Sequence, residues 1–182
     1  VVKWLRKGGL VDALGSTTTR GGRTTTDTLL LAATAYGHLA MVRELLKRGA
    51  SVDLPSSLGI TALMEAARYD HISIVLVLLQ HSANPDLQDI DGVTALMKAA
   101  DQGHEACVKA LLRAKANTEL LDKNGDTALQ RAKDQGHTAV AELLRQHAAP
   151  PQPATAAPAT PPDTGEPAVS APTSLPLEIY QS

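Results

Sequence analysis

Four histidines recur at a constant spacing of 33 residues: His38, His71, His104 and His137. Such a series could be imagined as a ladder of metal sites. Equivalent positions on stacked helices lie about 10 Å apart, however, whereas a metal ion needs its ligands at about 2 Å. We therefore expect no metal site, and we interpret each histidine as a buried structural side chain that bonds the backbone at a turn.

Cys107 is the single cysteine of the chain. A reactive cysteine needs solvent exposure and a neighbouring base, whereas the helical spacing of the apolar residues around Cys107 predicts a buried position. We interpret it as a small apolar filler. A lone cysteine also excludes a disulfide framework and is typical of a reducing compartment, so we expect an intracellular protein, cytoplasmic or nuclear.

Two kinds of segment resemble ion-binding loops. Residues 15–21 read Gly-Ser-Thr-Thr-Thr-Arg-Gly, but they lack the lysine and the spacing of a phosphate-binding loop. We expect a flexible loop there, and the alternative is phosphorylation of a threonine near Arg20 and Arg23. The acidic clusters at 86–91 and 122–126 lack the calcium-loop pattern and are typical of turns. No Ser-His-Asp set has a supporting spacing, so we expect no enzyme activity and no cofactor.

The composition narrows the classes of protein further. The 182 residues carry a net charge of -2, and only 2% of them are aromatic. A core must therefore be built from Ala, Leu and Val, which suits closely stacked helices. The dense basic stripe and stacking aromatic residues of a nucleic-acid surface are missing. The longest apolar run, residues 72–79, is too short for a bilayer, which takes about 20 residues. We expect neither nucleic acid nor membrane as a partner.

The elements that carry the histidines repeat along the chain. The triplet Thr-Ala-Leu begins at Thr61, Thr94 and Thr127, each ten residues before a histidine, and Thr28 continues the series backwards. The apolar positions that follow have helical rather than alternating spacing. Each unit therefore predicts two helices joined by a tight turn, with the threonine capping the first helix. Leu-Leu pairs stand in the second helices at 45–46, 78–79, 111–112 and 143–144.

These motifs resemble the ankyrin repeat, whose T-P-L-H, A-A, G-H and L-L signature is present here with Ala in place of Pro. The resemblance covers residues 1–148 and implies an all-α solenoid of stacked helix-turn-helix units with projecting loops. Stability then comes from stacking each unit on its neighbours. The expected segments are a partial repeat with a loop insertion at 1–23, repeats at about 24–56, 57–89, 90–122 and 123–148, a Pro/Ala/Thr-rich disordered linker at 149–176, and the start of an unknown following segment at 177–182.

The first loop departs from the regular repeat. The gap between Asp12 and Thr28 holds eight residues more than the equivalent gap after Asp53. We expect the inserted residues to form a mobile excursion, in a fold that contains no sheet.

Two further departures concern the second helices. Gly49, which ends the first of them, is replaced at the equivalent positions by Ser82, Lys115 and His147. We expect these residues to adopt a left-handed conformation at a cost of about 1 kcal/mol each. Residues 72–79 are rich in β-branched side chains and alone would favour a strand, but their register in the repeat predicts a helix.

Because no catalytic, metal, nucleic-acid or membrane function is expected, the sequence predicts a surface that binds another protein. In the ankyrin family, partners usually lie along the concave face formed by loop tips and exposed first-helix positions, and we carry this over by position. Tyr36 and Tyr69 are the strongest candidates, because tyrosine is enriched in interface hot spots. The other helix residues are Glu65, Arg68, Lys98, Asp101, Gln102, Arg131, Asp134 and Gln135, and the loop-tip residues are Ser57, Leu58, Ile60, Ile90, Asp91, Val93, Lys123, Asn124 and Asp126.

The resulting prediction is a monomeric protein-protein interaction module whose partner is another protein. Two alternatives stay open. The repeats could be the regulatory or substrate-recruiting region of a larger enzyme, such as a kinase or ubiquitin ligase, or the cytosolic part of a channel. They could also be a spacer without a dedicated partner. Because the chain begins within a repeat, we expect it to be a fragment of a longer protein.

Overall fold

The computed structural model describes residues 11–12, 14–18 and 24–148. Most of the expected partial first repeat, the arginines beside the possible phosphorylation site, the Pro/Ala/Thr-rich linker and the final segment lie outside the described residues.

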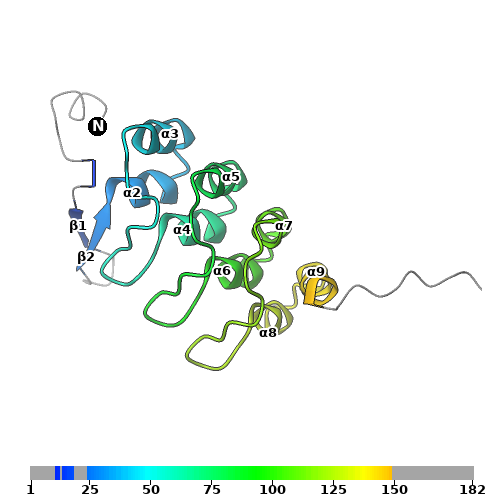
Figure 1. Ribbon diagram of the computed structural model, residues 1–182. Helices are drawn as coiled ribbons and strands as arrows, with labels where there is room; N and C mark the ends of the chain where they lie inside the picture. The colour runs from blue at the N-terminus through cyan, green and yellow to red at the C-terminus, as the bar shows by residue number, and fades with distance from the viewer. Residues whose placement is uncertain (1–10, 13, 19–23, 149–182) are drawn as a thin grey trace, which may run out of the picture. The chain divides into compact units, whose positions relative to one another are not determined.

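Eight helices follow one another in four pairs within the described part of the chain (Figure 1). The first helices form one row, the second helices form another, and the loops project beyond the row of first helices (Figure 1). This arrangement confirms the all-α solenoid of stacked helix-turn-helix units. The pairs are α2 (Leu29–Ala35) with α3 (Leu39–Lys47), α4 (Ala62–Arg68) with α5 (Ile72–Gln80), α6 (Ala95–Gln102) with α7 (Glu105–Arg113), and α8 (Ala128–Asp134) with α9 (Thr138–Ala148).

Each first helix is capped by the repeating threonine, as expected. The Thr28 hydroxyl accepts a hydrogen bond from the N–H of Leu31 at 3.0 Å. Thr61, Thr94 and Thr127 accept the equivalent bond from the residue three positions later, at 3.4, 3.2 and 3.2 Å. Each bond satisfies one of the amide groups that a helix start leaves without a partner. The caps therefore fix where every first helix begins.

Small and aliphatic side chains build the core between the two rows. The alanine pairs of α4 and α6 are fully buried, and their size lets neighbouring first helices pack closely. Leu45, Leu78 and Leu111 are also fully buried and occupy equivalent places in the second helices. Residues 72–79 lie within α5, so burial in the stack overrules their local preference for a strand.

The inserted segment differs from the expectation that the fold contains no sheet. Strands β1 (Leu14–Thr18) and β2 (Thr24–Thr28) pair antiparallel, with Leu14 opposite Thr28. Four of the five residues of β2 are threonines, whose β-branched side chains favour strands. The N–H of Ser57 also donates to the carbonyl of Thr26 at 3.3 Å. Residues 14–18 and 24–28 therefore pair as two strands that also bond the next loop, where no sheet was expected.

Loop aspartates join one repeat to the next, because their carboxylates accept a hydrogen bond from a backbone N–H of the following repeat. Two of these bonds span 31 residues of sequence and the first spans 39, a difference that equals the eight-residue insertion. Asp12 therefore occupies the loop position of a preceding repeat. The bonds run to Asp12 from Ser51 at 3.0 Å, to Asp53 from Asn84 at 3.1 Å, and to Asp86 from Asn117 at 2.8 Å.

Positive φ angles occur where the second helices end. Gly49 has a φ of 84°, and Ser82 and Lys115 have φ of 63° and 62°, which confirms the left-handed conformation expected for both replacements. The expectation was wrong for His147, which lies inside α9 because this helix continues to Ala148.

Lys115→Gly is expected to raise the free energy of unfolding by about 0.5 to 1 kcal/mol, because glycine adopts this φ without steric cost. Urea denaturation measures the change. The matched control is Lys109→Gly in the middle of α7, where glycine should destabilise by a similar amount. A lower midpoint for Lys115→Gly than for the unmodified protein would contradict the strain at this position.

Thr34 is a buried polar residue whose hydroxyl has no hydrogen-bond partner. The equivalent residues of α4 and α6 are Ala67 and Ala100. Thr34→Val removes the unsatisfied hydroxyl and keeps the volume, so we expect a gain of about 1 kcal/mol in unfolding free energy. In contrast, Thr61→Val removes a helix cap and should lose about 1 kcal/mol. Loss of stability in both variants, measured by thermal unfolding, would count against the buried hydroxyl as a cost.

Candidate functional site

Three of the four repeating histidines bond the backbone of the preceding repeat. The Nε2 atom of His71 lies 3.3 Å from the carbonyl oxygen of Ala35, and the equivalent distances are 3.0 Å from His104 to Arg68 and 3.0 Å from His137 to Asp101. These three rings are half-buried, not fully buried as expected, and His38 is exposed. They satisfy carbonyl groups at the ends of first helices, which lack partners within the helix. The interpretation as structural backbone-bonding side chains is supported for His71, His104 and His137, and is not supported for His38.

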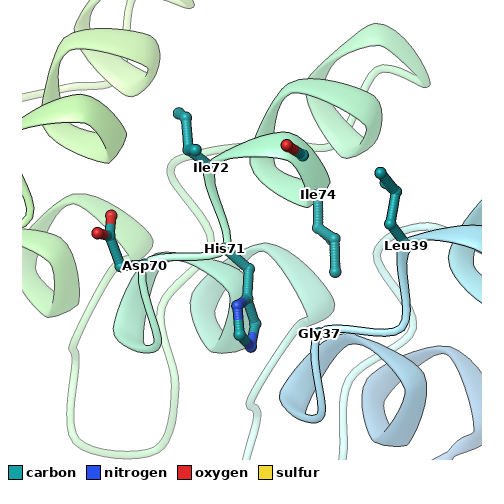
Figure 2. Close-up of a pocket in the computed structure, with 7 residues that line it drawn as sticks. Gly37, Leu39, Asp70, His71, Ile72 and Ile74 are labelled. Atoms are coloured by element: carbon teal, nitrogen blue, oxygen red, sulfur yellow. The ribbon is translucent and has the colours of Figure 1, made fainter.

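A cavity of about 310 Å³ lies at the turn between α4 and α5. Figure 2 shows the His71 ring beside the turn at Gly37, with Asp70 and Ile74 around the same space. A Cβ on Gly37 would lie only 2.9 Å from the His71 ring, so the ring fills the room that glycine leaves. Among the residues that the structure describes, no group of three His, Cys, Asp or Glu side chains could hold a metal ion.

Cys107 is fully buried, which confirms its interpretation as an apolar filler. Its Sγ atom lies 3.4 Å from a carboxylate oxygen of Asp70. Burial, followed by the hydrogen bond to Asp70 and the charge of Asp70, raises the pKa of the Cys107 thiol to about 12. The thiol therefore stays protonated at neutral pH, which makes it a poor nucleophile.

Tyr36 and Tyr69 are exposed side chains at equivalent ends of α2 and α4. Tyr36 is 77% exposed and Tyr69 is 48% exposed. The ring centroids lie 6.2 Å from those of His38 and His71, respectively. The Arg68 guanidinium also lies 5.4 Å from the Tyr69 ring centroid, within the range of a cation-π interaction. Both tyrosines thus combine exposure with neighbours that orient their rings.

The loop tips are joined to one another by backbone hydrogen bonds. The N–H of Ile90 donates to the carbonyl of Leu58 at 3.1 Å, and the N–H of Lys123 donates to the carbonyl of Asp91 at 2.9 Å. Ile90, Asp91, Lys123 and Asn124 are exposed there. The exposed Leu121 belongs to the same region and was missed in the sequence. The sequence contained an indication of this exposed apolar residue, because Leu121 occupies the repeat position that the polar Gln88 holds in the preceding repeat.

Lys98 and Arg131 are less accessible than expected for the concave face. The Lys98 ammonium lies 2.8 Å from the carboxylate of Asp89, and the Arg131 guanidinium lies 2.6 Å from that of Asp122. Arg131 also reaches Asp101 at 3.5 Å. Both cations are half-buried. They hold the loops against the first helices instead of projecting freely.

The two aspartates of these ion pairs organise the loop tips. Each carboxylate also accepts hydrogen bonds from the N–H groups two and four residues later, at 2.8 to 3.0 Å. Burial alone would raise the pKa of Asp89 and Asp122, but Lys98 and Arg131, together with those N–H groups, hold both pKa values below the usual 3.8. Their stabilising contribution is present above this value and is lost as the pH falls through the folded-state pKa.

The remaining helix residues continue this surface towards α8. Gln102, Asp134 and Gln135 are exposed, whereas Asp101 is half-buried. The Asp101 carboxylate lies 3.5 Å from the Gln135 side-chain nitrogen. This end of the surface is polar.

Glu65 is buried, contrary to the expected exposed position: it is only 8% exposed. It occupies the place of Lys98 and Arg131 in the next repeats, but the equivalent of Asp89 is Ser56, whose hydroxyl accepts bonds from two backbone N–H groups. Burial raises the pKa of Glu65 above 4.5, and this effect exceeds the opposing charges of Arg68 and Lys98.

Glu65→Gln is expected to stabilise the protein at pH 7 by about 1 kcal/mol, because it removes a buried charge without a hydrogen bond. The sign follows from the raised pKa of Glu65: its ionisation costs nothing below the unfolded-state value of about 4.5 and costs progressively more as the pH rises through the folded-state pKa. The advantage of the variant should therefore shrink towards pH 4. Thermal unfolding from pH 4 to 7 tests this, with the exposed Glu105→Gln as control. A difference that is independent of pH would contradict it.

The comparisons with known proteins agree with the repeat geometry. A family model described as "Ankyrin repeats (3 copies)" matches residues 1–89 and again residues 81–153. No curated protein matches the chain. No helix in the described ranges has the length and apolar character that crossing a membrane requires.

Proposed function

The chain belongs to the ankyrin-repeat family, whose repeats are generally protein-protein interaction modules and are typically non-catalytic, and from this premise we propose that it binds a protein partner through its concave face and loop tips. The concave face consists of the exposed first-helix residues Tyr36, Arg68, Tyr69, Gln102, Asp134 and Gln135, and the loop tips present Ile90, Asp91, Leu121, Lys123 and Asn124.

The observation that carries this proposal is the pair of exposed tyrosines on consecutive first helices. A solvated helix face has no need of a large aromatic side chain, whereas a tyrosine in an interface buries a large area and loses little conformational entropy. The exposed Ile90 and Leu121 add apolar area at the loop tips.

The contacts that hold the first helices and loops in place also favour binding. Threonine caps, histidine bonds to the preceding repeat, the tip-to-tip hydrogen bonds and the Lys98 and Arg131 ion pairs all restrict motion of the first helices and loops. A surface that is ordered before binding loses less entropy when a partner docks. We further propose a monomer inside the cell, cytoplasmic or nuclear. Leu76 is a single exposed leucine on α5, and one such residue does not form an apolar patch.

Affinity capture with the full chain, followed by mass spectrometry, tests the proposal. The matched bait carries Tyr36→Ala and Tyr69→Ala, and a control bait carries Leu76→Glu on a second helix. We expect one set of proteins to be retained by the unmodified and control baits and lost from the double variant. Equal retention by all three baits would contradict a partner on the concave face.

A further inference from the structure

The loop tips form a row in which each tip accepts a backbone hydrogen bond from the next one along the chain. The carbonyl of Leu58 accepts from the N–H of Ile90 at 3.1 Å. One repeat later, the carbonyl of Asp91 accepts from the N–H of Lys123 at 2.9 Å. The acceptors are 33 residues apart, and so are the donors. The same contact therefore joins each of these tips to its neighbour.

A glycine follows each acceptor and leaves room for the neighbouring backbone. A Cβ on Gly59 would lie only 3.0 Å from the Cα of Asp89, and a Cβ on Gly92 would lie 3.0 Å from the Cα of Asp122. Glycine permits this close approach of one backbone to another. The structure therefore shows twice what packs at this place: a stretch of backbone that brings an N–H group to the acceptor carbonyl.

Residues 121–126 form the last loop tip of the described part of the chain, before α8 (Figure 1). Asn124 stands at the place of Leu58 and Asp91, but its carbonyl accepts no hydrogen bond within the described ranges. Gly125 has a φ of 84°. Apart from Gly125 itself and its two chain neighbours, no atom of the residues that the structure describes lies within 4 Å of an added Cβ. The last loop tip thus presents the same acceptor and the same open approach.

The side chain beside this acceptor favours an apolar neighbour. In the preceding repeat, the side-chain amide of Gln88 donates to the carbonyls of Gly92 at 2.7 Å and Leu121 at 2.9 Å, so it ties one tip to the next. Leu121 takes the place of Gln88 at the last loop tip, where it is 54% exposed. A leucine donates no hydrogen bond, but it gains free energy when another apolar side chain covers it.

We propose that the last loop tip binds a short segment of the protein partner, which donates a backbone N–H to the carbonyl of Asn124 and packs an apolar side chain on Leu121. This inference rests on the proposed function, because it specifies the partner chemistry for one part of the same loop-tip surface. The segment continues the row of tip-to-tip hydrogen bonds that the repeats already form. Main-chain hydrogen bonds then contribute affinity, and the apolar contact selects the segment.

A displayed library of random peptides, selected on the immobilised full chain, tests the proposal. We expect the enriched peptides to share an apolar residue at one fixed position. The best peptide should bind Gly125→Ala at least tenfold more weakly, because the added methyl group blocks the approach of the peptide backbone.

The matched control is Gly136→Ala, at the turn between α8 and α9. Gly136 also has a positive φ, of 76°, and an added Cβ there likewise meets nothing within 4 Å in the described part of the chain beyond its adjoining residues. This variant bears the same backbone strain as Gly125→Ala and should leave the affinity for the peptide unchanged. Thermal unfolding of both variants shows that they are equally folded.

Two further measurements separate the backbone bond from the apolar contact. N-methylation of the peptide, one amide at a time, should weaken binding about tenfold at a single position, the one that supplies the N–H group for Asn124. Leu121→Gln introduces the residue of the preceding repeat and should also weaken binding, because it removes the apolar contact. Tolerance of N-methylation at every position would overturn the backbone bond, and unchanged binding to Leu121→Gln would overturn the apolar contact.

The outcomes also separate this inference from the proposed function. Peptides that lose affinity for Tyr69→Ala but bind Gly125→Ala as tightly as the unmodified chain would overturn the site at the last loop tip and leave the concave face in place. Self-association of the unmodified chain that Gly125→Ala abolishes would assign the tip to a second copy and overturn the proposal. Peptides that bind both variants as tightly as the unmodified chain, or a selection that enriches no peptide, would overturn the inference and the proposed function together.

Discussion

Gly103→Ala is expected to lower the free energy of unfolding by about 2 to 3 kcal/mol. Gly103 ends α6 with a φ of 75°, and a Cβ at this position would lie 2.6 Å from Nδ1 of His137. The left-handed conformation alone costs an alanine about 1 kcal/mol. The displaced His137 ring would also lose its 3.0 Å bond to the carbonyl of Asp101, which adds about 1 to 2 kcal/mol because the carbonyl is left without a partner.

Gly49→Ala separates the two contributions. Gly49 has a φ of 84°, but apart from Gly49 itself and its two chain neighbours no atom lies within 4 Å of the position of its added Cβ. This control should therefore lose only about 1 kcal/mol. Urea denaturation of both variants measures the difference. Equal losses would mean that the histidine does not join one repeat to the next in the way that the geometry indicates.

Tyr69→Ala should weaken partner binding at least tenfold, and the Tyr36→Ala, Tyr69→Ala double variant should weaken it further. Truncation of a buried interface anchor typically costs about 2 kcal/mol or more. Both side chains are exposed in the free protein, so the thermal midpoint should change little. Isothermal titration calorimetry against the captured partner measures the affinity.

The control for the tyrosines is Leu76→Glu, which alters an exposed position on α5 and should leave the affinity unchanged. Unaltered affinity in the double tyrosine variant would move the binding surface to the loop tips or to the second helices. A large loss of thermal stability in the tyrosine variants would show instead that the rings support the fold.

The 33-residue period predicts the fold because it fixes both the helix starts and the bonds between repeats. Thr61 predicts a cap, and His71 predicts a bond to the backbone near the turn; both are present. Lys115 could be assigned a positive φ by comparison with Gly49 alone. These features depend on the place of a residue in its own repeat, which is the information that a sequence period contains.

Features that depend on contacts between different positions could not be predicted in the same way. The paired strands β1 and β2 lie in an insertion that has no equivalent in the other repeats. Alignment of the repeats therefore gave no indication of strands there. The exposure of Glu65 was misjudged because its burial depends on the neighbouring first helices and on Ser56 replacing an aspartate. Pairing of Lys98 with Asp89 likewise requires knowing how the loop folds back on its helix.

The most direct test of the concave-face proposal is to observe the tyrosine rings during binding. The chain contains only three tyrosines, one tryptophan and no phenylalanine, so the ring resonances of Tyr36 and Tyr69 can be resolved in the proton NMR spectrum of the full chain and assigned with the single alanine variants. On titration with the captured partner, both ring signals should shift or broaden in proportion to the bound fraction. Saturated binding that leaves both signals at their free positions would contradict a partner on the concave face.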